Sequence, residues 1–297
     1  MKKTILITGA SGFLGWELCQ LASDQYKVCG TYFSHPVSNT NWQLVNIDLC
    51  NYKQLRELFK TIKPDGVIHA AAAADPNWCQ TNPQLSYKIN VQLAINIAGL
   101  ASDRHIPCVF TSTDLVFDGE TGNYKENDTL NPVCLYGEQK ALAEGAMQER
   151  YPLMTICRLP LMFGLPSPTS ASFFTNILNN LKQNIPQKLF ADEYRSMVGN
   201  TTISKGLLSA LQIKHGAILH LGGSEPISRY QFGLQVAETF YLDPKTIISS
   251  KQNEVTMPAK RPANVTLNSE RAYSTIQYQP ATIKEQLQII QNEIDHE

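Results

Sequence analysis

The segment TILITGASGFLGWEL, at positions 4–18, decides how the rest of the chain is interpreted. TILIT is a short apolar run typical of a buried strand, and FLGWEL resembles the start of a helix. Between them stand Gly9, Gly12 and Gly15, which permit a tight turn and a close approach of a pyrophosphate to the positive end of the helix. The spacing is G-x-x-G-x-x-G, so the plain G-x-G-x-x-G dinucleotide fingerprint is not matched. The competing interpretation is a turn that binds no ligand. The sequence downstream has to decide between the two.

Strands and helices alternate downstream, as a nucleotide-binding fold requires. Short buried strands that alternate with helices predict a parallel sheet covered on both faces, with right-handed crossovers. We therefore predict an α/β protein with a Rossmann-type doubly wound parallel sheet. The predicted strands lie at 27–33, 42–48, 65–71, 106–113 and 153–160, and the helices between them include 52–62, 84–102 and about 132–149.

This regular alternation ends near residue 160. FGLPSPTSAS, at 163–172, is a Pro/Ser-rich connector, and one more strand is expected at 217–223. We predict that residues 1–160 form an NAD(P)-binding Rossmann domain and that residues 161–297 mainly form a smaller C-terminal substrate-binding lobe. The strand at 217–223 could return to the main sheet. Further helices are expected at 171–183, 202–213 and 281–295.

The composition excludes several classes of protein. The chain has 297 residues, 43% of them hydrophobic, and a formal net charge of −1, so neither nucleic-acid binding nor a membrane-surface role has electrostatic support. No stretch approaches the ~18 apolar residues of a membrane span. The seven cysteines are scattered and the six histidines show no ligand-like spacing. We therefore expect reduced thiols, no metal site and a cytoplasmic location.

The end of the second strand bears on the choice of cofactor. In NAD-binding proteins an acidic residue here contacts the adenosine ribose. The sequence GTYFSHP, at 30–36, has none, and Ser34 and His35 could instead meet a 2′-phosphate, so NADP is favoured over NAD. Asp48, after the third strand, is either a partner for the adenine edge or the N-cap of the following helix.

Tyr136 and Lys140 stand four residues apart at the start of the helix predicted from about 132. Residues at this spacing share one helix face, so a phenol and an ammonium would lie on a single surface. The pair alone is weak evidence, since an exposed ring beside a solvated lysine has the same pattern.

Several motifs together resemble a known family. The glycine turn, HAAA at 69–72, TSTDLVF at 111–117 and the Tyr-x-x-x-Lys pair occur in the order seen in extended short-chain dehydrogenases/reductases. STDLVFDG at 112–119, RLPLMFG at 158–164 and RPANVTL at 261–267 resemble the dTDP-4-dehydrorhamnose reductase-like branch of sugar-nucleotide reductases. The resemblance covers essentially the whole chain, more specifically in the cofactor half.

The resemblance implies an NAD(P)-dependent oxidoreductase of dTDP-rhamnose biosynthesis or a related pathway, acting on a nucleotide-activated 4-keto-6-deoxysugar. Tyr136 would be the general acid that protonates the substrate carbonyl, and Thr113 would orient the same oxygen. Lys140 would bind the nicotinamide ribose and, with an oxidised nicotinamide nearby, lower the pKa of the phenol from its usual value near ~10.

The resemblance also implies the residues of the two binding sites. Arginines suit a diphosphate, although each could equally be a solvated surface charge. The expected substrate contacts are Asp114, Arg195, Arg229 and Arg261. The expected cofactor contacts are Gly9, Ser11, Gly12, Phe13, Leu14, Gly15, Ser34, His35, Asp48, Leu49, Ala70, Ala71, Ala72, Asn90, Tyr136, Lys140 and Leu159.

Two positions depart from the family pattern. Related dehydratases carry Glu where this chain has Leu115, so dehydration is disfavoured, and related reductases commonly carry Tyr there. Met197 stands where the family usually has Pro. Both changes point to altered substrate contacts.

Two other functions stay open at this stage. One is epimerisation of a nucleotide sugar with tightly retained NAD. The other is a dinucleotide-binding regulatory subunit that resembles the beta subunit of methionine adenosyltransferase, because a fold and even a site can persist without turnover. Many relatives dimerise through the helices expected at 84–102 and 132–149, so the resemblance also allows a homodimer.

Overall fold

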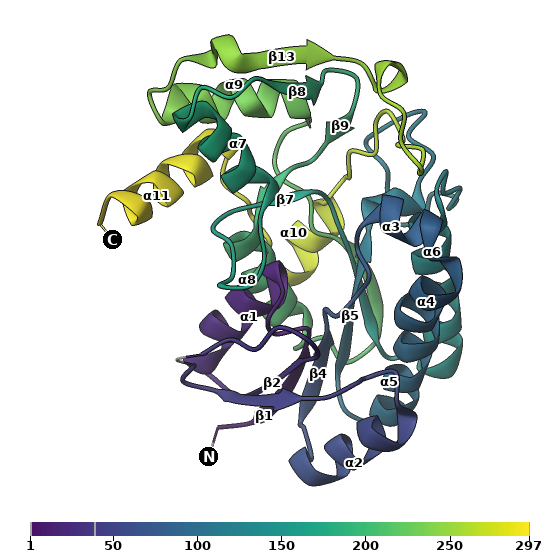
Figure 1. Ribbon diagram of the computed structural model, residues 1–297. Helices are drawn as coiled ribbons and strands as arrows, with labels where there is room; N and C mark the ends of the chain where they lie inside the picture. Colours follow the sequence, from purple (N-terminus) through teal and green to yellow (C-terminus); the bar gives the residue numbers. More distant parts are fainter. Residues whose placement is uncertain (1, 39, 297) are drawn as a thin grey trace.

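Seven strands pair in parallel into one sheet, in the order β11-β6-β5-β4-β1-β2-β3. The computed structural model describes residues 2–38 and 40–296 (Figure 1). The strand order reverses between β1 and β4, which is the switch point at which doubly wound sheets bind ligands. The predicted Rossmann-type fold is confirmed. The strands are β1 (Thr4–Thr8), β2 (Lys27–Tyr32), β3 (Gln43–Asn46), β4 (Gly66–His69), β5 (Cys108–Thr113), β6 (Thr155–Leu159) and β11 (Ala217–His220).

Helices cover both faces of this sheet. One face carries α2 (Tyr52–Ile62), α5 (Leu93–Ser102) and α6 (Leu135–Arg150). The other carries α1 (Phe13–Ser23), α8 (Asn200–Ala210) and α10 (Glu270–Ile276).

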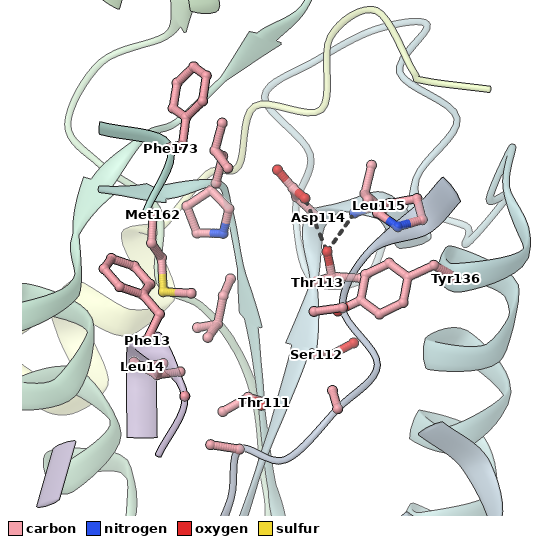
Figure 2. A pocket seen from close by; sticks show the side chains of 18 of the residues that line it. Phe13, Leu14, Thr111, Ser112, Thr113, Asp114, Leu115, Tyr136, Met162 and Phe173 are labelled. Carbon is pink, nitrogen blue, oxygen red and sulfur yellow. Dashed lines mark hydrogen bonds between the residues drawn. The ribbon is translucent and has the colours of Figure 1, made fainter. Parts of the chain in front are cut away.

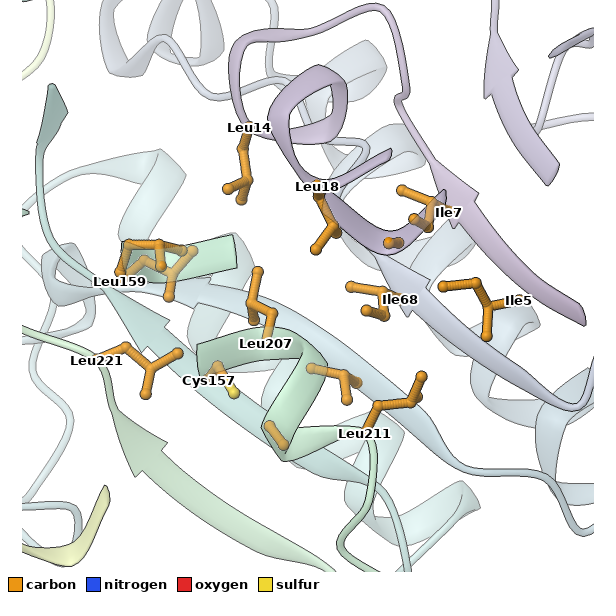
Figure 3. Close-up of a cluster of buried hydrophobic side chains, with 14 of the residues drawn as sticks. Ile5, Ile7, Leu14, Leu18, Ile68, Cys157, Leu159, Leu207, Leu211 and Leu221 are labelled. Atoms are coloured by element: carbon orange, nitrogen blue, oxygen red, sulfur yellow. The ribbon is translucent and has the colours of Figure 1, made fainter. Parts of the chain in front are cut away.

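Alternation along each strand supplies both hydrophobic layers. In β1, Ile5 and Ile7 point to α1 and α8, whereas Leu6 points to the opposite layer. Figure 3 shows the first layer, in which Leu18 of α1 and Leu207 of α8 lie over the strands. Residues from both ends of the chain therefore complete one core.

The helix predicted over 84–102 is three segments. They are α4 (Pro83–Tyr87), a π-helical turn, η1 (Lys88–Gln92), and α5. A π turn accommodates one residue more than an α turn and often lies near functional sites. The buried side chain of Asn90 in this turn holds the backbone of Ala73, accepting from its N–H at 2.9 Å and donating to its carbonyl at 3.1 Å. A short helix that was not predicted, α3 (Pro76–Thr81), precedes them, capped by Asp75.

The C-terminal lobe, drawn at the top of Figure 1, has its own apolar cluster. Its two-residue strands were not predicted because they are too short to show a period. Two short helical turns, η3 (Pro244–Thr246) and η4 (Gln252–Glu254), flank β13, and η2 (Asp114–Val116) follows β5. The lobe's helices are α7 (Phe173–Lys182), α9 (Arg229–Thr239) and α11 (Ile283–His296), and its small strand pairs are β8 (Gln187–Phe190) with β13 (Ile247–Ser250), β9 (Tyr194–Arg195) with β12 (Ile227–Ser228), and β7 (Met162–Phe163) with β10 (Val198–Gly199).

Residues 2–38 and 40–296 contain neither a helix able to span a membrane nor a cluster of metal-ligand side chains. No helix in these ranges combines the length and apolar character needed to cross a bilayer. Within the same ranges, no group of three or more His, Cys, Asp or Glu side chains is arranged to hold a metal ion.

Candidate active site

The glycine-rich turn forms the floor of the site between β1 and α1. Gly9 has φ +75°, and a Cβ there would lie 2.9 Å from the Cα of Ala71. A Cβ on Gly15 would lie 2.1 Å from the carbonyl oxygen of Gly9. Gly12, the N-cap of α1, provides no side chain to the free N–H groups of the first turn. These groups are therefore free to bind an anion, which fits the pyrophosphate of a dinucleotide.

A buried threonine and histidine fix the opposite wall. The hydroxyl of Thr8 accepts from the N–H groups of Ala70 and Ala71, both at 3.1 Å, so its own proton goes to Nδ1 of His69 at 2.7 Å. Burial lowers the pKa of His69 to about 3, and Lys140 adds to this effect, so the ring is neutral with its proton on Nε2. His69 in HAAA therefore shapes the cofactor groove.

One cavity of about 470 Å³ lies between the turn and the carboxyl ends of β2 and β3. The expected residues Ser34 and Asp48 line it, whereas the neighbouring His35 and the buried Asn90 do not. Lys88 also lines this cavity. Sequence analysis missed this residue because the residue pattern of its helix does not show that it faces the cofactor groove. Other expected residues in the wall of this cavity are Gly9, Ser11, Gly12, Leu49, Ala70, Ala71 and Ala72.

The alternative role of Asp48 as a helix N-cap is wrong. Asn51 caps α2, because its side-chain oxygen accepts from the N–H of Gln54 at 3.2 Å. Asp48 instead accepts from the N–H of Cys50 at 2.9 Å in a tight turn, which leaves it in the cavity wall.

A second cavity of about 420 Å³ lies at the carboxyl ends of β5 and β6. It shares Gly9, Gly12, Ala70 and Ala72 with the first cavity, so the two form one groove. Figure 2 shows two opposed walls. Phe13, Leu14, Met162 and Phe173 form the apolar wall, and Ser112, Thr113, Asp114, Leu115 and Tyr136 form the other.

Thr113 and Tyr136 line this cavity together, whereas Lys140 lies behind it. The Thr113 hydroxyl donates to Oδ1 of Asp114 and accepts from the N–H of Leu115, both at 3.2 Å (Figure 2). Lys140 is 2% exposed, and its ammonium lies 3.9 Å from the centroid of the Phe110 ring, a cation–π contact.

The expected lowering of the Tyr136 pKa is wrong. Burial raises the pKa of Tyr136 above its usual value, and the neighbouring Cys79 and Asp114 add to the shift. Burial also lowers the pKa of Lys140 to about 7, against the opposing charge of Glu144. At neutral pH a substantial fraction of this amine is neutral, so it gives the phenolate less support than a permanent ammonium would.

The arginines expected to bind substrate differ in their surroundings. Arg195 is 2% exposed and pairs with Asp114 at 3.0 Å and Glu193 at 2.9 Å, so its charge is already balanced. The Arg229 side chain is 25% exposed and pairs with Glu193 at 3.0 Å. Arg261 donates to the carbonyl of Ala259 at 3.0 Å and, within the described part of the chain, makes no ion pair. All three line the second cavity.

Comparison with known proteins places the chain in a family. Residues 1–295 match the family model described as the RmlD substrate binding domain. The chain belongs to this family. It is 27% identical over 285 residues to the probable low-salt glycan biosynthesis reductase Agl14 of Haloferax volcanii, with 95% of each protein covered. It is also 27% identical over 296 residues to a dTDP-4-dehydrorhamnose reductase of Aggregatibacter actinomycetemcomitans, covering 93% of this chain and 94% of that protein.

A solved structure shows the same fold. The dTDP-4-dehydrorhamnose reductase of Bacillus anthracis in complex with NADP superposes with a TM-score of 0.87 at 21% identity, covering 99% of this chain and all of that one (100%). The predicted fold and the predicted membership of the dTDP-4-dehydrorhamnose reductase-like group are confirmed. The chain is also similar to the beta subunit of methionine adenosyltransferase 2 of Xenopus tropicalis. The two are 26% identical over 275 residues, which cover 90% of this chain and 80% of that protein.

Proposed function

We propose that the protein is an NADPH-dependent reductase of a nucleotide-activated 4-keto-6-deoxysugar. One observation carries the proposal: Thr113 and Tyr136 line the same cavity as the glycine turn of the cofactor groove. A phenol and a hydroxyl beside a dinucleotide turn are suited to reduction of a carbonyl group. The reductases among the relatives support the same activity.

The side chains have distinct roles in this reaction. The dinucleotide, when bound, supplies the hydride. Tyr136 donates its phenolic proton to the carbonyl oxygen of the substrate, and the Thr113 hydroxyl turns its proton from Asp114 to the same oxygen. Because the pKa of Tyr136 is raised, the phenol carries its proton at neutral pH, which is the form that a reduction consumes. The charged form of Lys140 stabilises the phenolate that remains.

The cavity at the carboxyl ends of β2 and β3 favours NADP over NAD. No acidic residue follows β2, and Ser34 and Lys88 both line this cavity. A hydroxyl and an ammonium suit a 2′-phosphate, whereas an acid at the end of β2 would suit a free ribose hydroxyl. The reductase of Bacillus anthracis, whose fold this chain shares, was solved with NADP, which supports the same choice.

Arg229 and Arg261 are the arginines best placed to bind the substrate diphosphate. In this region three arginines face only the two carboxylates Asp114 and Glu193, which leaves an excess of positive charge. Burial lowers the pKa of Arg229, with further lowering by the charges of Arg195 and Arg261, so an anion placed among them would be favoured. The charge of Arg195 is neutralised by Asp114 and Glu193, so Arg195 does not bind the diphosphate.

The test is oxidation of NADPH, and separately of NADH, followed by absorbance with dTDP-4-keto-6-deoxymannose as substrate. Tyr136→Phe should lower kcat by roughly 100-fold or more, since a positioned general acid contributes about 10²–10⁴-fold. Tyr241→Phe, at a side chain that is 88% exposed, is the matched control and should keep the wild-type rate. No oxidation of either cofactor by folded wild-type protein would refute the reductase proposal for this sugar.

A second candidate is a dinucleotide-binding regulatory subunit, favoured by the similarity to methionine adenosyltransferase 2 beta subunits. It predicts NADPH binding without turnover, together with co-elution of a larger partner from the source cell extract. Epimerisation, the third candidate, predicts interconversion of sugar epimers by protein that retains NAD through purification.

A further inference from the structure

The hydroxyl of Thr113 has a single proton, which it donates to Asp114 until a substrate carbonyl oxygen takes its place as acceptor. It donates to Oδ1 of Asp114 while the N–H of Leu115 occupies one of its lone pairs, both at 3.2 Å. The position of the Asp114 carboxylate therefore decides where the Thr113 hydroxyl points in the cavity.

Asp114 is itself held from the C-terminal lobe. Its side chain is 3% exposed, and its second oxygen, Oδ2, lies 3.0 Å from Nη1 of Arg195. A buried carboxylate without a cation would be unstable in its charged form, and loss of a partner from such a pair leaves the remaining charge uncompensated. Arg195 is thus the cation that opposes this cost and lies against the second oxygen of the carboxylate.

Arg195 is fixed by a second carboxylate and by the backbone. Glu193, which is fully buried, accepts from Nε of Arg195 at 3.3 Å and from Nη2 at 2.9 Å. Arg195 also pairs with Ile227 where β9 and β12 run antiparallel. Nη2 of Arg229, at the start of α9, reaches the same Glu193 oxygen at 3.0 Å.

These groups form an alternating row of charges that crosses from the C-terminal lobe to the end of β5. In order they are Arg229, Glu193, Arg195 and Asp114, followed by the Thr113 hydroxyl. Two cations and two anions balance, so the row needs no substrate anion at Arg195. A diphosphate ligand at this position would have to displace two carboxylates from a side chain that is 2% exposed.

We propose that Arg195 is a positioning residue, which orients the Thr113 hydroxyl through Asp114 and so makes the carbonyl-binding geometry depend on the C-terminal lobe. The inference rests on the proposed reductase function. It assigns to Arg195 a role other than substrate binding, and it explains why a guanidinium is buried between two carboxylates at the lobe boundary.

A double-mutant cycle in kcat tests the proposal. Arg195→Lys keeps the charge but lacks the planar fork that meets two carboxylates. Alone it should lower kcat by roughly 10- to 100-fold, since misplacement by ~1 Å can cost about 100-fold. In a Thr113→Val background the same change should alter kcat less than about twofold, because the hydroxyl it orients is gone. Equal losses in both backgrounds would overturn the proposal.

The matched control is Arg158→Lys. Arg158 is another deeply buried arginine with a carboxylate partner, Glu144 at 2.8 Å. Neither residue of this pair contacts Asp114 or Thr113 in the described part of the chain. The effect of Arg158→Lys on kcat should therefore be the same with and without Thr113→Val. Thermal unfolding of each variant separates loss of folded protein from loss of rate.

A crystal structure of the Arg195→Lys variant provides a readout that needs no substrate. Loss of the Thr113–Asp114 hydrogen bond supports the proposal, and an unchanged Thr113 rotamer with that bond intact overturns it. If wild-type protein does not reduce the sugar, the proposed function has failed and this structural comparison alone decides the role of Arg195.

Discussion

At the scale of single residues, the site combines a buried acid with a buried base. Tyr136 and Lys140 lie on one face of α6, as their spacing predicts. Their pKa shifts could not be derived from spacing, because they result from burial by α3, β5 and the loop around Ala259. Sequence analysis named Arg195 and Asp114 as substrate contacts but did not predict their ion pair, since it joins residues from separate lobes.

Lys140→Met tests the burial of the amine. The pKa of Lys140 in the folded protein is about 7, against its usual value of 10.5, so burial of its charge destabilises the folded state fully below pH 7. As pH rises from 7 toward 10, the unfolded chain still binds this proton while the folded protein has released it, and this penalty disappears. We expect the Met variant to be inactive yet more stable than wild type at pH 7.

Chemical denaturation of both proteins at pH 7, 8 and 9 measures this difference. The advantage of the Met variant in free energy of unfolding should shrink as pH rises. A constant difference across this range would mean that Lys140 has an ordinary pKa in the folded protein.

At the scale of elements, the seven-stranded sheet and most of its helices follow from strand–helix alternation and short apolar runs. The interruption of the 84–102 helix did not, because a π turn leaves no residue pattern. In this turn Asn90 hydrogen-bonds the backbone of Ala73, which lies outside the helix. The small strands β7, β9, β10 and β12 have two residues each and are defined by their partners.

Two glycine substitutions distinguish an effect on the cofactor-binding turn from an effect on helix stability. A Cβ on Gly15 would lie 2.1 Å from the carbonyl oxygen of Gly9, so Gly15→Ala should distort the turn and weaken NADPH binding at least 10-fold in a fluorescence titration. Gly145, in α6, has nothing within 4 Å of its position for a Cβ. Gly145→Ala should therefore raise the free energy of unfolding by about 0.5–1 kcal/mol with unchanged NADPH affinity. Equal NADPH affinities in the two variants would count against the turn as the cofactor site.

At the scale of the whole molecule, elements from both sides of residue 160 share the main sheet and one of its cores. The strand at 217–223, β11, pairs with β6 at the sheet edge, and α8 and α10 cover the face that α1 leaves open. Leu18 and Ile68 share one core with Leu207 and Leu219 (Figure 3). Composition located the change in rhythm near 160, but it could not show that later elements return to complete the first half.

Expression of residues 1–160 alone tests this dependence. The fragment would expose the apolar face of the sheet that α8 and α10 cover, together with the edge of β6 that β11 occupies. Exposed apolar surface and an unpaired strand edge favour aggregation over folding. We expect the fragment to show no cooperative thermal unfolding by circular dichroism and no NADPH binding, whereas the full chain unfolds in one transition. A fragment that unfolds cooperatively and binds NADPH would establish residues 1–160 as an independent domain, and would mean that the C-terminal elements contribute to the site without being needed for the fold.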